Sequence, residues 1–105
     1  MCTNIAIITS RSQHQVETIS KKIDNVFTCY YKEYDEGMAE IGFDSKDVFP
    51  LVEMESITKN VKSEDLYIQV VSYELQSEYV GHHIFKDLIW IDKLSKINDA
   101  GYEKS

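Results

Sequence analysis

Proline, glycine and cysteine are all scarce in this sequence, which has one Pro, four Gly and two Cys among 105 residues. Collagen-like and low-complexity proteins need far more proline and glycine, so both classes are excluded. Because 43% of the residues are hydrophobic, the chain can form a core, unlike an intrinsically disordered protein. Cys2 and Cys29 could form at most one disulfide, and we expect both to be reduced thiols in a cytoplasmic protein.

Long apolar stretches are missing as well. No segment approaches the ~20 consecutive apolar residues of a membrane-spanning helix. The first residues, Met-Cys-Thr-Asn, lack the basic and apolar regions of a secretory signal. These absences predict a cytoplasmic protein with no membrane partner. Since a domain typically has ~100–200 residues, we expect residues 1–105 to form a single domain.

Recognisable catalytic and metal-binding motifs are absent from the sequence. Neither Cys-x-x-Cys nor His-Glu-x-x-His occurs, and adjacent residues such as His82 and His83 point to opposite faces of a strand. Cys29 and His14 could act as nucleophile and base, but Cys29 alternates with apolar residues and is better explained as a small buried hydrophobe. The glycines form no phosphate-binding loop. We therefore expect no metal, no cofactor and no enzymatic activity.

Asp87 is the one carboxylate that interrupts an apolar segment. It falls between Phe85 and Ile89 in the apolar run 84–91, which predicts a central strand. A carboxylate on such a strand is either paired with a base or functional with a raised pKa, and pairing is the more economical explanation. An enzyme that uses Asp87 with His82 and His83 stays a third hypothesis for this chain.

Apolar periodicity predicts an ordered series of helices and strands. Residues that recur every three to four positions indicate helices, and alternation indicates strands. Ser10 and Gln13 form a potential capping box at the start of the first helix. The expected elements are a strand over 3–9, a helix over 11–24, a β-hairpin over 27–43, a helix from Asp47 to about 62, strands over 66–75 and 84–91, and a short closing helix around Leu94 and Ile97.

This order is typical of an α+β protein. We predict a two-layer sandwich in which two helices cover one face of a mixed or antiparallel sheet of about five strands. The expected arrangement is a split βαβ unit with the ferredoxin-like order β-α-β-β-α-β-β. Within the hairpin, alternation predicts that Cys29 and Tyr31 lie on the apolar face, whereas Tyr30, Lys32 and Tyr34 point away from it.

Acidic residues are in excess, and the excess is concentrated in one segment. The net charge of −7 and the sequence pI near 4.8 disfavour nucleic acids and anionic membranes as partners. Residues 33–55 contain eight acids and one base, whereas the rest of the chain contains ten of each. The entire net charge therefore arises from about a fifth of the sequence.

The acidic segment also contains tyrosines, and tyrosine is enriched at protein interfaces. The acids fall on a hairpin and on the entry to the next helix, so we expect them to form one surface that binds a basic protein. An equally simple explanation is a solvated surface that keeps the protein soluble. The expected partner-binding residues are Tyr31, Glu33, Tyr34, Asp35, Glu36, Glu40, Asp44 and Asp47.

These features predict an acidic inhibitor of a basic protein. Its size and charge are those of bacterial immunity proteins, which neutralise nuclease-type toxins during bacterial competition, although this is an analogy of class without a shared motif. One alternative is a small regulatory or ligand-binding domain that forms a homodimer through a sheet edge. Another is a phage-encoded inhibitor of a nucleic-acid-binding protein.

Overall fold

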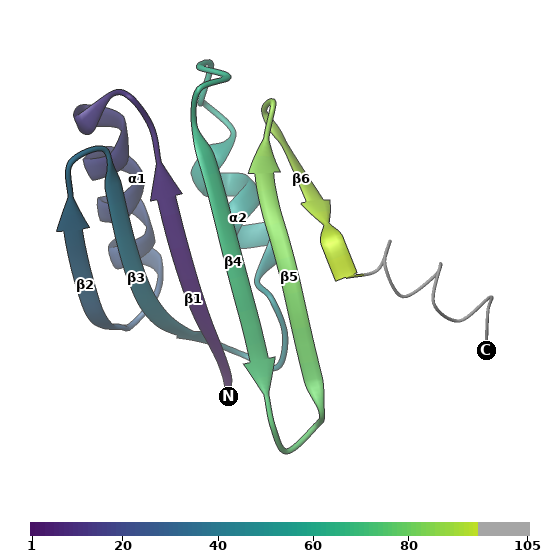
Figure 1. Cartoon of the computed structure of the whole chain (residues 1–105). Coiled ribbons are helices and arrows are strands. Elements are labelled where there is room, and N and C mark those ends of the chain that lie inside the picture. Colours follow the sequence, from purple (N-terminus) through teal and green to yellow (C-terminus); the bar gives the residue numbers. More distant parts are fainter. Residues whose placement is uncertain (95–105) are drawn as a thin grey trace.

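The computed structural model describes residues 1–94, which form six strands and two helices. The six strands make one antiparallel sheet in the order β2-β3-β1-β4-β5-β6. Both helices lie on the same side of this sheet (Figure 1). The elements are β1 (Cys2–Thr9), α1 (Gln13–Val26), β2 (Cys29–Asp35), β3 (Met38–Ser45), α2 (Leu51–Thr58), β4 (Tyr67–Glu74), β5 (Tyr79–Lys86) and β6 (Ile89–Asp92). The predicted α+β class is therefore confirmed.

The hydrophobic core fills the space between the sheet and the two helices. Strand β1 lies inside the sheet, and its alternate residues Ala6 and Ile8 are completely buried beneath the helices. The same alternation continues on the neighbouring strands, where Ile41 and Val70 pair in register with Ala6. One face of each inner strand thus supplies the core. No helix of residues 1–94 is long and apolar enough to cross a membrane.

Helix α1 follows the predicted periodicity but begins two residues later than expected. Ser12, and not Ser10, is the N-cap, and its side chain accepts a hydrogen bond from the Gln15 N–H. The Ser10 hydroxyl instead donates to Asp65 Oδ2 at 2.8 Å. Val16 and Ile19 are buried against the sheet, as the apolar stripe of a helix requires.

A β-bulge changes the predicted orientation of β2. The pairing register with β3 shifts between Cys29 and Tyr31, so one additional residue lies on the bulged strand. Beyond the bulge, Lys32 pairs with the inward-facing Ile41, and its ammonium contacts Asp24 of α1 at 2.8 Å. The prediction that Tyr31 lies on the apolar face, with Lys32 and Tyr34 pointing away from it, was therefore wrong. Simple alternation fails because the inserted residue reverses every side chain that follows.

Helix α2 is shorter than predicted, and it does not begin at Asp47. Pro50 occupies the N-cap, and the helix extends from Leu51 to Thr58. Asp47 has a φ of 66° in the preceding loop, outside the helical region. The start at Leu51 has a steric cause, because the residue before a proline is disfavoured in helical conformation.

The apolar run 84–91 is a β-hairpin and not the predicted central strand. Asp87 and Leu88 have φ angles of 52° and 69°, as a tight two-residue hairpin turn requires. This turn separates β5 from β6, so the sheet has six strands instead of about five. Asp87 is exposed in the turn, and the prediction that it lies on a strand was wrong. The closing helix predicted around Leu94 and Ile97 lies largely outside the described residues.

Candidate protein-binding surface

No helix or strand of residues 1–94 covers the side of the sheet opposite the two helices (Figure 1), and half of the sheet's side chains point to that side. We call this surface the open face. It follows from the strand registers, because residues that alternate with the buried ones share the opposite side. The open face comprises Tyr30, Tyr31, Glu33 and Asp35 of β2, Met38, Glu40, Gly42 and Asp44 of β3, Thr3, Ile5, Ile7 and Thr9 of β1, Tyr67, Gln69, Val71 and Tyr73 of β4, Val80, His82, Ile84 and Lys86 of β5, and Ile89 and Ile91 of β6.

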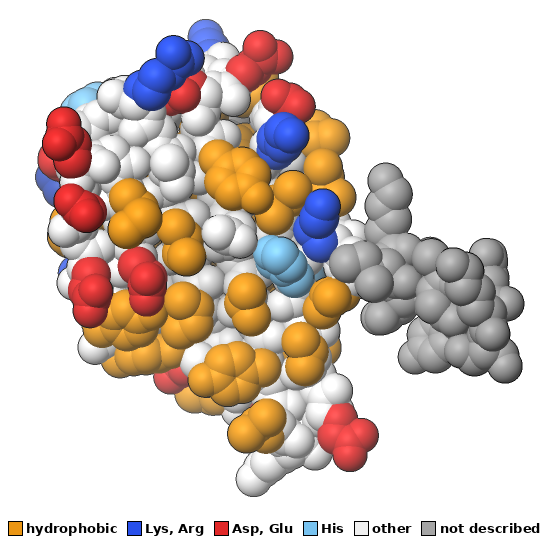
Figure 2. Space-filling view, viewed as in Figure 1, with side chains coloured by type: hydrophobic (Ala, Val, Ile, Leu, Met, Phe, Trp, Pro, Cys, Tyr) orange, Lys and Arg blue, Asp and Glu red, His pale blue; other side chains and the backbone are white. Residues whose placement is uncertain are grey.

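The open face is largely apolar from its middle strands to β6. Figure 2 shows hydrophobic side chains across this face, with acidic side chains on the side of β2 and β3. Val80 is 61% exposed and Ile89 is 59% exposed, while Val71 lies between them and β1. Scattered apolar residues are normal on a protein surface, but a contiguous exposed patch marks an interaction site.

The part of the open face on β2 and β3 combines aromatic rings with carboxylates. We call it the acidic half; its residues are Tyr30, Tyr31, Glu33, Asp35, Glu40 and Asp44. The bulge places the consecutive residues Tyr30 and Tyr31 on the same side, with ring centroids 5.6 Å apart. Both rings lie over Gly42, where an added Cβ would overlap them. Glycine at this position therefore makes room for the two tyrosines.

Hydrogen bonding orders this aromatic pair. The Tyr31 hydroxyl donates to Glu40 Oε2 at 2.6 Å. Burial and the Glu40 carboxylate raise the pKa of Tyr31, since both disfavour a second negative charge. Burial also raises the pKa of Tyr30, to which the nearby Asp44 carboxylate contributes. Both phenols thus stay neutral. The Tyr31 hydroxyl uses its one proton on Glu40, so only the Tyr30 hydroxyl can donate a hydrogen bond to a partner.

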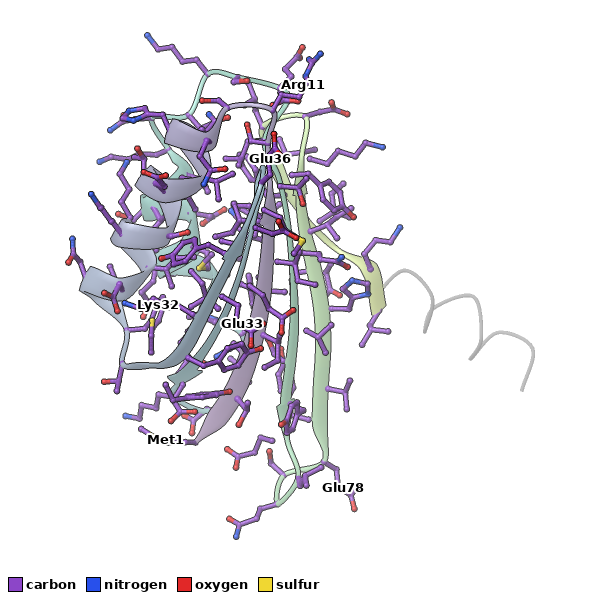
Figure 3. All side chains as sticks on the ribbon, turned by 60° about the vertical axis from the view of Figure 1, so that its left-hand side comes forward. Met1, Arg11, Lys32, Glu33, Glu36 and Glu78 are labelled. Atoms are coloured by element: carbon purple, nitrogen blue, oxygen red, sulfur yellow. The ribbon has the colours of Figure 1, made fainter. Side chains whose placement is uncertain are left out.

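The structure separates the eight residues predicted to bind a partner. Tyr31, Glu33, Asp35, Glu40 and Asp44 share the open face. Tyr34 pairs with the inward-facing Ala39 and borders a pocket with Gln13, Glu17 and Lys21 of α1. Figure 3 shows the same contrast for adjacent residues, with Lys32 on the helix side of β2 and Glu33 on the open side.

The remaining acids of the segment point elsewhere. Glu36 lies in the β2–β3 turn and lines a pocket with Arg11, at the end of the sheet labelled in Figure 3. Asp47 is exposed in the loop before α2. Glu53 and Glu55 are exposed on α2, in the helix layer. Tyr30 was missed by the sequence prediction, although its position next to a second tyrosine and opposite a glycine is a usable signal.

Of the two histidines considered as catalytic residues, His83 packs inside the structure. His83 stacks on Phe49 with ring centroids 3.9 Å apart, and its Nε2 lies 3.7 Å from Asp92 Oδ2. Burial lowers the pKa of His83, which favours the neutral ring. His82 points to the open face from the next position. No group of three or more His, Cys, Asp or Glu within residues 1–94 could hold a metal ion.

Cys29 lies beside the core and not in a reactive environment. It is partly buried and packs against the hydrophobic cluster. Burial raises the pKa of its thiol to about 11, with a further contribution from the Asp24 carboxylate. Because the thiolate is the nucleophilic form, Cys29 is unreactive at neutral pH.

Comparison of the chain with protein families, with curated proteins and with solved structures gives no match.

Proposed function

We propose that this protein is an acidic inhibitor that covers the active site of a basic protein, as an immunity protein does for a nuclease-type toxin. The observation that carries the proposal is the acidic half of the open face, where two tyrosines lie among four carboxylates on an uncovered part of the sheet. These residues come from two adjacent strands of a packed sheet, so their positions are determined before a partner binds. Preorganisation of this kind reduces the entropy lost on association.

The chemistry of this surface suits a cleft lined with lysine and arginine. Clefts that bind nucleic acid carry such residues, and carboxylates can take the place of phosphates against them. The tyrosine rings add apolar area with little loss of conformational entropy. Charge complementarity of this kind accelerates association to ~10⁸–10⁹ M⁻¹s⁻¹ at low salt. A phage-encoded inhibitor of a nucleic-acid-binding protein would use the same surface, so the nature of the basic partner distinguishes the two versions.

The experiment is to measure inhibition of a basic nuclease domain encoded next to this gene. We expect a one-to-one complex that suppresses nuclease activity, and an association rate that falls several-fold as salt rises, since exposed charges are screened beyond ~10 Å. Glu33→Lys combined with Asp35→Lys should weaken binding by at least ~2 kcal/mol.

A matched control is available in the helix layer. Glu53→Lys combined with Glu55→Lys makes the same change in net charge on α2, away from the open face. We expect this variant to bind almost as well as the natural protein. If both variants lose affinity equally, the contact depends on net charge alone and the acidic half is not the binding surface.

A further inference from the structure

We infer that the open face binds a second copy of this chain, with the acidic half of each copy against a basic half of the other. The basic half lies on β5 and β6 and contains Lys86, with Lys93 exposed at the end of β6. Such a dimer would be a property of the free protein, independent of any basic partner. The inference rests on the distribution of charge across one apolar surface.

Opposite charges occupy opposite sides of the open face. Strands β2 and β3 contribute four carboxylates to it and no lysine or arginine. Residues 79–94 contain two lysines, Lys86 and Lys93, and two aspartates. Asp92 lies on the helix side beside His83 and Asp87 lies in the β5–β6 turn, so the lysines are the charges that this end of the sheet adds to the open face. Figure 2 shows Lys or Arg side chains next to histidine on that side of the face. The strands between them, β1 and β4, present Ile5, Ile7 and Val71. The surface therefore has an acidic side on β2 and β3, and an apolar remainder on which Lys86 and Lys93 place positive charge near the opposite edge.

If the strands of the two copies stay aligned, two-fold symmetry allows two ways of stacking this face on itself. With the axis perpendicular to the strands, β2 lies over β2 of the second copy, and acid faces acid. With the axis parallel to the strands, the sheet is turned over from side to side, so β2 lies over β6 and β3 lies over β5. Only the second arrangement places Glu33 and Asp35 against Lys86 and Lys93. Like charges across an interface cost several kcal/mol, so the charge pattern selects the parallel axis.

In this arrangement the most apolar strands meet at the centre. The axis passes between β1 and β4, the third and fourth strands of the order. Ile5 and Ile7 of one copy then pack near Val71 of the other, which resembles the core of a β-sandwich with sheets ~10 Å apart. The charged residues form the rim, as in protein interfaces generally.

The open face is large enough for a stable dimer. Six strands ~4.8 Å apart, with about eight residues of ~3.4 Å each, give a face of roughly 600 Å² in projection. The accessible area exceeds the projection because the side chains are corrugated. A standard interface buries ~800 Å² per partner, so this face is of the right size.

The sheet edges are less suited to self-association than the face. The edge strand β6 has four residues, and the other edge, β2, carries a bulge and alternating charges. Short, bulged or charged edge strands are the features that prevent edge pairing. Face-to-face packing therefore fits the molecule better than a dimer joined through an edge.

The first test is the mass of the full chain in solution, measured by sedimentation equilibrium at tens of micromolar. We expect twice the 12.2 kDa of one chain. Val71→Lys places a charge in the centre of the interface, at a residue that is 42% exposed in the monomer, and should give a folded monomer. Val52→Lys is the matched control on α2, 76% exposed, and should remain dimeric. A monomeric natural protein, or a Val71→Lys dimer of unchanged affinity, would overturn the proposal.

The second test reverses the charges at exposed positions, where folding is not at risk. One variant carries Glu33→Lys and Asp35→Lys, and the other carries Lys86→Glu and Lys93→Glu. Each alone should dimerise at least about tenfold more weakly at low salt, because like charges then face each other. Mixed together they should form a heterodimer of nearly natural affinity, since both charge pairs are restored. Failure of the mixture to restore dimers would exclude this arrangement.

These results are separate from the proposed inhibition. A protein that dimerises but inhibits no basic nuclease would support the dimer and contradict the proposed inhibition. A monomer that binds a basic nuclease would do the reverse. Where both hold, the partner competes with the second copy for Glu33 and Asp35, so binding should weaken as the protein's own concentration rises.

Discussion

The two faces of the sheet differ in what their apolar residues accomplish. On β4, Val70 is completely buried beneath the helices, while its neighbour Val71 is 42% exposed on the open face. Both are β-branched and suited to a strand, but only Val70 contributes to the core of the monomer. Val71 and its neighbours Ile5 and Ile7 on the open face lie outside that core. The binding that we propose would account for their apolar character.

Polar groups also differ between the two faces of the sheet. On the helix side, the Asn4 amide donates to Ser45 Oγ at 2.9 Å and accepts from the Ser72 hydroxyl at 2.6 Å. This fully buried cluster is satisfied within the monomer, as buried polar groups require. On the open side, Glu33 and Asp44 have surfaces available to a partner. The Asn4 cluster is therefore satisfied within the monomer, whereas the carboxylates of the open face are available to a partner.

The largest expected difference between the faces is in stability. Val70→Ala removes two buried methyl groups and leaves a cavity, so it should lower the free energy of unfolding by about 2 kcal/mol. Val71→Ala should cost less than ~0.5 kcal/mol in dilute protein, since surface changes are usually small. Urea denaturation of both variants measures the contrast. Equal losses would mean that the open face is covered within the monomer.

A smaller effect is expected where the tyrosines lie over Gly42. Gly42→Ala inserts a Cβ into space occupied by the Tyr31 and Tyr30 rings, and overpacking of this kind typically costs ~1–3 kcal/mol. The rings must move, which should also break the bond between Tyr31 and Glu40. Combining Gly42→Ala with Tyr31→Ala should reduce the additional cost of the alanine at 42. If the two changes are simply additive in urea denaturation, the rings do not depend on Gly42.

On the helix side of the sheet, His83 should make the free energy of unfolding depend on pH. Burial lowers the pKa of His83, so the unfolded chain takes up a proton more readily than the folded one. The stabilisation is fully present above the unfolded pKa of about 6.5 and is lost as the pH falls from there through the folded value. His83→Gln should therefore reduce the loss of stability between neutral and mildly acidic pH, measured by urea denaturation. His14→Gln, exposed on α1, is the control and should leave that loss unchanged.

The smallest expected effect is a change in the spectroscopic titration of Tyr31 on the open face. Because burial and Glu40 raise the pKa of Tyr31, this phenol should ionise at higher pH than an exposed tyrosine. Glu40→Gln removes the neighbouring negative charge and should lower the pKa of Tyr31. The difference in ultraviolet absorbance between each protein and its Tyr31→Phe version isolates this one phenol. An unchanged titration would show that Glu40 is not its partner.

Regular periodicity explains why much of the fold could be predicted. Val16, Ile19 and Ile23 follow a helical stripe, and all three are buried in α1. The strand over 3–9 and the hairpin over 27–43 also exist, with ends shifted by a few residues. Local patterns predict such elements because the apolar residues that define the pattern are those that the core buries.

Two backbone irregularities explain most of what the sequence prediction missed. The bulge between Cys29 and Tyr31 changes which side chains share a face, and no residue in that segment is specific for a bulge. The turn at Asp87 and Leu88 adopts positive φ without glycine or asparagine, so Asp87 is the only turn-favouring residue in the run 84–91. In both cases the pairing of neighbouring strands outweighs the local preference.

The amino-acid sequence by itself determined the α+β class, the position of α1 and the concentration of negative charge in one fifth of the chain, because composition and periodicity are local properties. Only the tertiary structure decided which acids lie together, since a single inserted residue in β2 turned Tyr31 and Glu33 to the open side beside Tyr30, and Tyr34 toward α1. The position of a strand within a sheet depends on partners distant in sequence. For that reason, the pairing of β2 and β5 with their neighbours set both the acidic and the basic side of the open face.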